Sequence, residues 1–149
     1  MPVDYLLDTN VLLRALVAAN PSRTVARHAI RALLRSGADL CVAPQNLVEF
    51  WSVSTRPAKD NGLGKTVAAT DRYCRFIESF LAVLPETTAI FAEWRSLVVA
   101  HEVHGKQVYD ARLVATMKAH AIGRILTFNV QDFTRYRDVG VEAVHPEMV

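Results

Sequence analysis

The chain has 149 residues, of which 51% are hydrophobic, so it can bury the core of one domain and has no excess length that demands a second. Its formal net charge is only +2, so a nucleic-acid partner would have to be held by a local group of Lys and Arg side chains. We therefore expect a single domain over residues 1–149.

Composition also excludes several locations. No run of about eighteen apolar residues occurs, and Asp8 interrupts the first apolar stretch, so neither a membrane span nor a secretion signal is predicted. Cys41 and Cys74 have no zinc-type spacing, and two cysteines alone do not make a disulfide framework. We expect a protein of the reducing cytoplasm with no membrane partner.

Short β-type runs alternate with longer helical patterns, as is typical of α/β domains. Strands are predicted at residues 3–7, 40–43, 82–84, 124–128 and 141–144. Helices are predicted at residues 9–17 and 20–37, from 44 to a loop at 57–64, and at 65–81, 86–101 and 108–121, with a helical turn at 129–136. This order predicts a central, mostly parallel sheet of four or five strands with helices on both faces.

Residues that favour helix ends mark several of these boundaries. Asn20 and Pro21 fit the N-cap and the first position of the second helix. The apolar face of this helix is expected to comprise Val25, Ala29, Ala32 and Leu33. Gly37 and Gly123 are expected to end the second and the last long helix, since glycine adopts the left-handed conformation of a helix end without strain.

Three carboxylates, Asp8, Glu49 and Asp110, lie far apart in the sequence, each inside or beside an apolar segment. Burying an ionised carboxylate is costly unless it is paired or binds a cation. Asp8 follows the first strand and therefore lies at the rim where open α/β sheets bind ligands. If the fold brings the three acids together, they are suited to a hard divalent metal such as Mg²⁺ or Mn²⁺.

Each acid also has a purely structural interpretation. Asp8 fits the N-cap of the helix at 9–17, and Glu49 fits a solvated surface acid. Asp110 fits an acid in the first turn of its helix, where a negative charge interacts favourably with the helix dipole. However, it lies in line with an apolar stripe at helical spacing, formed by Leu113, Val114, Met117 and Ala121.

Asn129 and Asp132 follow the fourth predicted strand, and a parallel sheet would place them on the same rim as Asp8. A structural role is equally open, because Asn129 fits a capping residue and Asp132 supports the first helical turn. Thr9, Asn10 and Thr127 are candidate hydrogen-bonding partners of the acids, although Thr9 and Asn10 also suit a helix start.

The chain resembles the PIN-domain ribonucleases, and among them the VapC-type toxins of bacterial toxin–antitoxin pairs. The resemblance spans nearly the whole sequence, and its motifs are the segments 6–12, 46–51, 109–115 and 126–133. It implies a PIN-like three-layer sandwich and an endoribonuclease that uses Mg²⁺ or Mn²⁺ to cut single-stranded RNA, leaving 5′-phosphate and 3′-hydroxyl ends. It also implies a cognate antitoxin as partner and a homodimer.

By this resemblance, Asp8, Glu49 and Asp110 match the three most regular acids of the family. Asp8 and Asp110 are then the direct metal ligands, with Glu49 as a further ligand or the group that orients or deprotonates the attacking water. Many relatives have Asp where this chain has Asn129, so Asp132, one turn later, is the candidate for the fourth catalytic acid. One or two bound metal ions both remain open.

Basic residues offer candidate contacts to RNA or to an acidic antitoxin segment. They are Arg23, Arg27, Arg31 and Arg35, which recur every four residues along one helix, and Arg112 beside Asp110. Like charges at this spacing repel by roughly a few tenths of a kcal/mol per pair, which an external anion would offset. A solvated basic face is the simpler interpretation of the same pattern.

Two other classes of protein share part of this pattern. A haloacid-dehalogenase-type phosphotransferase also begins with Asp at a strand end, but needs a second Asp where Asn10 stands. A PIN-fold module that binds RNA or a partner without catalysis is a stronger alternative, since Asn129 departs from the family pattern. Retention of Asp8, Glu49 and Asp110 argues against it.

Overall fold

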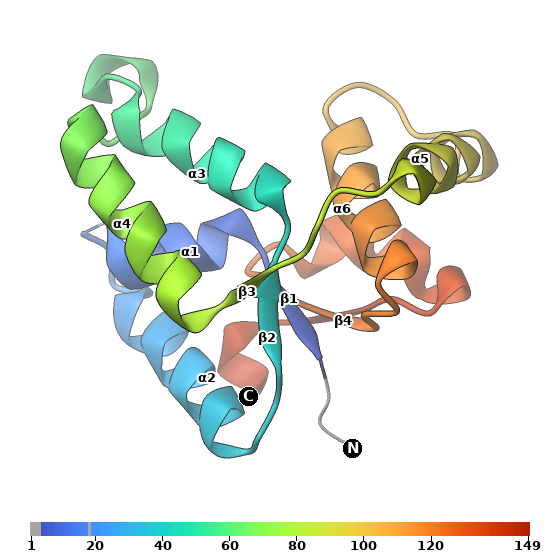
Figure 1. Cartoon of the computed structure of the whole chain (residues 1–149), viewed down its shortest axis with the longest axis horizontal. Helices are drawn as coiled ribbons and strands as arrows, with labels where there is room; N and C mark the ends of the chain where they lie inside the picture. Colours follow the sequence, from blue (N-terminus) through green and yellow to red (C-terminus); the bar gives the residue numbers. More distant parts are fainter. Residues whose placement is uncertain (1–3, 18) are drawn as a thin grey trace.

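The computed structural model describes residues 4–17 and 19–149, and confirms the predicted α/β architecture (Figure 1). The central sheet has five strands in the order β3-β2-β1-β4-β5, and every neighbouring pair is parallel. The strands are β1 (Tyr5–Leu7), β2 (Leu40–Val42), β3 (Ala82–Val83), β4 (Arg124–Leu126) and β5 (Glu142–Val144). Each coincides with a predicted strand; Val3, the start of the first prediction, lies outside the described residues.

Helices connect the strands where the periodicity predicts them. The α-helices are α1 (Thr9–Leu16), α2 (Arg23–Arg35), α3 (Pro44–Thr55), α4 (Val67–Phe80), α5 (Thr88–Ala100) and α6 (Gln107–Ala119). Three shorter segments are 3-10 helices, namely η1 (Ala58–Asp60), η2 (Val130–Val139) and η3 (Pro146–Met148). The predicted turn at 129–136 is thus part of η2.

The helices form a layer on each side of the sheet, as predicted. In Figure 1, α1 to α4 lie on one side of the strands and α5 and α6 on the other. Neighbouring strand residues point to opposite faces, so Leu7 packs with Val11 and Phe50 in one core, whereas Leu6 packs with the second core. Val114 and other residues of α6 fill that second core. The chain is therefore a three-layer sandwich. None of the described helices is long and apolar enough to cross a lipid bilayer.

The start and buried face of α2 differ from the prediction. The helix begins at Arg23, because Asn20 uses its side-chain oxygen to accept a hydrogen bond from the Ser22 amide (2.7 Å) in a preceding turn. Its buried residues are Ala26, Ala29, Ile30 and Leu33. Val25 and Ala32 are only half-buried, so the predicted face was wrong at these two positions.

Glycine ends one of the two helices for which it was predicted. Gly37 has φ +83° after α2, and the Ala38 amide bonds back to Leu33 (3.1 Å). After α6 the left-handed residue is Ala121 (φ 56°), and the Ile122 amide bonds back to Met117 (2.8 Å). The prediction that Gly123 caps α6 was therefore wrong, because the chain turns two residues earlier.

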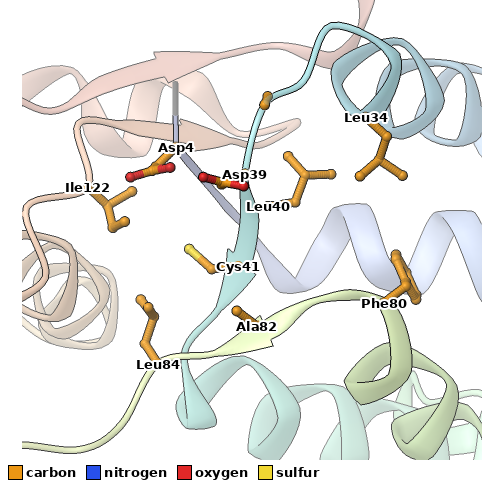
Figure 2. Close-up of a pocket in the computed structure, with 10 residues that line it drawn as sticks. Asp4, Leu34, Asp39, Leu40, Cys41, Phe80, Ala82, Leu84 and Ile122 are labelled. Carbon is orange, nitrogen blue, oxygen red and sulfur yellow. The ribbon is translucent and has the colours of Figure 1, made fainter. Parts of the chain in front are cut away.

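An apolar pocket of about 470 Å³ lies at the amino ends of β1 and β2, opposite the end at which Asp8 stands. Figure 2 shows Asp4 and Asp39 beside Cys41 in this pocket. The Cys41 thiol donates a hydrogen bond to the Tyr5 carbonyl, and burial, with these two carboxylates, raises its pKa to about 12. The thiol is therefore protonated and structural, and the pocket offers no nucleophile.

Candidate active site

Asp8 lies where β1 ends and α1 begins, and its two oxygens have different partners. Oδ1 accepts a hydrogen bond from the Thr9 amide (2.8 Å), which makes Asp8 the N-cap of α1. Oδ2 accepts hydrogen bonds from the Thr127 hydroxyl (2.8 Å) and from the Asn10 amide group (3.3 Å). The side chain is only 7% exposed. Asp8 is thus a helix cap and a buried rim carboxylate at once.

The surroundings of Asp8 oppose its ionisation. Burial raises its pKa to about 6, and the charges of Glu49 and Asp132 add to this effect. The hydrogen bonds from Thr127 and Thr9 act in the opposite direction, because they stabilise the carboxylate. Near neutral pH, Asp8 is an acceptor that is poised to bind a proton or another cation.

Glu49 is tied to this rim by both of its oxygens. Oε2 accepts a hydrogen bond from the Thr9 hydroxyl (3.0 Å), and Oε1 accepts one from Gln45 (2.7 Å) one turn earlier on α3. Gln45 also donates to the Tyr109 carbonyl (2.9 Å), which joins the start of α3 to the start of α6. Glu49 is half-buried, so it is not the freely solvated acid of the simpler interpretation.

Asp110 stands in the first turn of α6, half-buried above a core of Leu113, Val114 and Met117. Its pKa is raised to about 7, mainly by burial and then by the negative charges of Asp8, Asp132 and Glu49. The positive charge of Arg135 acts in the opposite direction. Since each carboxylate raises the pKa of the other, the two carboxyls titrate as a coupled pair above the usual range of aspartate. The structure brings the four predicted acids into one electrostatic cluster, which we call the acid cluster: Asp8, Glu49, Asp110 and Asp132.

Asn129 and Asp132 follow β4 on the same rim, and both side chains are exposed. Asn129 stands at the N-cap position of η2, as its structural interpretation has it, but its side chain makes no capping hydrogen bond. Its backbone instead fixes the turn, with its amide donating to the Thr127 hydroxyl (3.0 Å) and its carbonyl accepting from the Asp132 amide (3.1 Å). Asp132 influences Asp8 and Asp110 by charge.

The three smaller polar residues predicted around the acids all contact them or each other. Thr127 is fully buried and bonds to Asp8. The Asn10 side-chain nitrogen donates to Thr127 and Asp8, and its side-chain oxygen Oδ1 accepts from the Phe128 amide (3.2 Å). Thr9 bonds to Glu49. These bonds hold the ends of β1, β4 and α3 in register.

The predicted basic contacts divide into two places. Arg112 lies beside the acid cluster, where it forms an ion pair with Glu86 (2.8 Å) and bonds to Gln45 (3.4 Å). Arg27, Arg31 and Arg35 line a surface pocket made of α2 residues, and α2 packs against α1 and η3. The structure therefore places these α2 arginines apart from the acids.

In the part of the chain that the structure describes, no group of three or more His, Cys, Asp or Glu side chains is arranged closely enough to hold a metal ion by itself. The acids of the cluster interact by charge, without forming a closed cage. Asp8 and Asp110 are the pair in which both pKa values are strongly raised.

A family model described as PIN domain matches residues 5–139, a segment that includes every member of the acid cluster. The chain belongs to the PIN-domain family. This confirms the resemblance seen in the sequence motifs. No curated protein is significantly similar to this PIN domain in a direct sequence comparison.

Solved structures share the fold of this PIN domain at low identity. VapBC-1 from nontypeable Haemophilus influenzae has a TM-score of 0.70 and 13% identity, over 97% of this chain and 98% of that one. VapBC2 from Rickettsia felis, bound to a DNA fragment from its promoter, has a TM-score of 0.67 and 16% identity, over 96% of this chain and 98% of that one. Mycobacterium tuberculosis VapC20 is described as a toxin that cleaves the sarcin–ricin loop. It has a TM-score of 0.60 and 15% identity, over 81% of this chain and 86% of that one.

The structure adds residues to the PIN-domain site that sequence reasoning missed. Asn46 is fully buried, bonds to the Thr9 hydroxyl (3.2 Å) and caps the start of α3 by accepting from the Ala43 amide (2.8 Å). Its position after Pro44, at the third residue of the helix, is the signal that could have revealed it. Arg135 faces Asp110 from η2, and no spacing rule predicts that placement.

Proposed function

We propose that this PIN-domain protein is a divalent-metal-dependent endoribonuclease and the toxin of a toxin–antitoxin pair. The observation that supports it most is the acid cluster, in which burial and mutual repulsion raise the pKa of Asp110 to about 7 and of Asp8 to about 6. Perturbed carboxyls gathered at the rim of an α/β sheet are typical of catalytic sites. RNA is the proposed substrate because the sequence motifs resemble those of the PIN-domain ribonucleases, and the similar VapC20 is described as a toxin that cleaves the sarcin–ricin loop.

The donor set fits Mg²⁺ or Mn²⁺. Mg²⁺ is commonly held by one or two carboxylates and completes its shell with water, so a closed protein cage is not required. Asp8 and Asp110 would hold the ion, which would relieve the repulsion that raises both pKa values. When bound, such an ion polarises the scissile phosphate and makes a neighbouring water more acidic.

The surrounding side chains would prepare the acids for this reaction. Thr127 and Asn10 both donate to Oδ2 of Asp8, whereas in the described part of the chain Oδ1 accepts only from the Thr9 amide, so Oδ1 keeps a lone pair for a cation. Gln45 and the Thr9 hydroxyl fix Glu49, which would orient the attacking water and accept its proton. Asp132 would supply the fourth negative charge in place of Asn129, as an outer group or part of a second, weaker site.

A PIN-fold module without catalysis is the second candidate, favoured by Asn129 in place of an acid. The support around Asp8 and Glu49 argues against it. Both side chains are held by two or more hydrogen bonds in conformations that leave a carboxylate at the rim, which a pure binding module has no need to retain.

We propose an antitoxin partner because several of the similar structures are toxin–antitoxin complexes. A groove of about 460 Å³ between α1, α2 and α4 suits it, with Leu16, Tyr73 and Phe76 as apolar lining and Arg27 and Arg72 as cations. An amphipathic antitoxin helix with acidic residues beside its apolar face would be complementary to this groove. A homodimer remains a prediction from the resemblance, and a cytoplasmic location remains a prediction from the sequence composition.

The proposal is tested by incubating the full chain with a mixed structured RNA in Mg²⁺, Mn²⁺ or EDTA. Wild type, Asp8→Asn and Asp110→Asn are compared with Asp60→Asn, whose carboxyl is exposed on η1. We expect cutting that requires the metal, is lost in the first two variants and persists in Asp60→Asn. Cutting that persists in EDTA, or in both site variants, would refute the proposed chemistry. No binding of Mg²⁺ or Mn²⁺ in calorimetry would favour the binding module.

A further inference from the structure

A second pocket lies beside the acid cluster, between the end of β4 and the segment after β5. It has a volume of about 360 Å³ and is lined by Phe128, Asn129, Gln131, His145 and, on the side of the acids, Asp132. This volume falls in the range of roughly 300–1,000 Å³ that is usual for small-molecule sites. The pocket is therefore large enough for one planar aromatic group, and its occupant would touch Asp132.

Aromatic rings form one part of the lining. The rings of Phe128 and His145 lie 5.2 Å apart and perpendicular to each other, at 88°. The Arg14 guanidinium does not line the pocket but lies over the Phe128 ring, 4.1 Å from its centroid, and steadies that ring. Unpaired bases of RNA are typically held by such rings together with a neighbouring Arg.

The remaining lining offers hydrogen bonds that match the edge of a base. His145 accepts a hydrogen bond from the Glu147 amide at Nδ1 (3.1 Å), so its neutral ring carries the proton on Nε2 and can donate from there. Among the described residues, the side-chain amides of Asn129 and Gln131 have no hydrogen-bond partner. Each amide can both donate and accept, as the edges of nucleobases require.

In this pocket, Asn129 can donate a hydrogen bond to a ligand, which an ionised acid at the same position cannot do. A carboxylate at this position would add a further negative charge to the acid cluster and would offer only acceptors. The amide leaves the cluster to Asp132 and gives the pocket a donor. The substitution therefore fits recognition of substrate better than a loss of function.

We infer that this pocket binds one nucleobase of an unpaired RNA strand and sets the base preference at one position next to the cut. The inference rests on the proposed ribonuclease function and deepens it. Asn129, Gln131 and His145 contact the base edge, and Phe128, which Arg14 steadies, supplies an aromatic wall. None of these side chains takes part in the cleavage step.

The test maps cut positions in a pool of unpaired, random-sequence RNA. Wild type is compared with Gln131→Ala and His145→Ala, and with His104→Ala as a matched control in the loop between α5 and α6. We expect wild type and the control to prefer one base at a fixed position, and both pocket variants to lose this preference. Their KM should rise about tenfold with little change in kcat, as removal of one base contact predicts.

A second measurement separates this inference from the proposed function. Fluorescence anisotropy gives the affinity of each protein for labelled unpaired RNA, with duplex RNA for comparison. Because Gln131 is exposed, its variant should fold even if His145→Ala does not, and circular dichroism checks both. If wild type cuts RNA and both variants keep its preference, KM and affinity, the pocket is not a base site and the ribonuclease proposal stands. If wild type neither cuts nor binds unpaired RNA, both proposals fail together.

Discussion

The Thr127 hydroxyl donates a 2.8 Å hydrogen bond to Asp8, across 119 positions of sequence. It joins the carboxyl ends of β4 and β1, which are neighbours in the sheet. The same hydroxyl accepts hydrogen bonds from the Asn129 amide and from Asn10, so one buried oxygen organises three segments of the rim. This bond lowers the pKa of Asp8 against the larger effect of burial.

Replacing Thr127 with Val should impair metal use more than folding. The pKa of Asp8 would rise further, so a smaller share of the carboxylate would be ionised at pH 7. We expect activity or metal affinity to fall about 10- to 100-fold, the usual cost of losing an outer-shell partner. The metal concentration for half-maximal cutting is the measurement, and Thr127→Ser, which keeps the hydroxyl, is the control. Equal impairment by Ser and Val would show that the hydroxyl is not responsible.

The metal-free protein should lose stability as the pH rises toward neutrality. Asp8 and Asp110 bind protons more tightly when folded, with pKa values raised from 3.8 to about 6 and about 7. Their contribution to the free energy of unfolding is thus complete below about pH 3.8 and is lost as the pH rises through 6 and 7. Thermal melts in EDTA between pH 4 and pH 8 measure this loss, which saturating Mg²⁺ should reverse at pH 8.

Replacing Asp110 with Asn should stabilise the metal-free protein at pH 8 while abolishing cleavage, because it removes one of the repelling charges. After allowance for its partial exposure, we expect a gain of about 1 kcal/mol, or a Tm increase of roughly 2–4 °C for a chain of this size. At pH 4 the gain should vanish. Asp60→Asn, the exposed control, should show no pH-dependent gain; an equal gain there would rule out the acid cluster as the cause.

Gln45 should act through Glu49 rather than on the substrate. Its side chain fixes Glu49 at 2.7 Å and joins α3 to α6. Gln45→Ala should lower kcat about tenfold with a smaller change in KM, since it disturbs the group that orients the attacking water. Ser52→Ala, an exposed change on the same helix, is the control. An effect on KM alone would instead point to a direct contact with RNA.

The groove between α1, α2 and α4 should bind the antitoxin independently of catalysis. Phe76 is 54% exposed there, and Arg72 adds a positive charge. Phe76→Asp and Arg72→Glu should each weaken copurification of the antitoxin about tenfold or more and leave RNA cutting intact. Phe91→Asp, on exposed α5, is the matched control. Loss of the complex in the control variant alone would move the interface to α5.

Much of this architecture was predictable, because each element is encoded locally. Short continuous apolar runs specify the strands of this parallel sheet, and helical spacing specifies the helices. The predicted helix faces and helix ends were wrong where contacts between elements decide them. The apolar face of α2 includes Ala26 and Ile30 because of how that helix lies on α1, and α6 ends at a left-handed Ala121 although Gly123 was available.

The sequence by itself determined which element carries each acid: Asp8 follows the first strand, Glu49 lies within the helix that Pro44 opens, and Asp110 lies in the first turn of a later helix. The sequence also placed Asn129 and Asp132 on this rim, but left their roles open. Only the tertiary structure decided that Asp132 adds its charge to the cluster, that Asn129 lines a pocket beside it and that the α2 arginines line another pocket. The physical reason is the strand order. Pairing β4 directly with β1 places Thr127 against Asp8 and η2 beside α6, and this pairing arises from packing between segments more than a hundred residues apart.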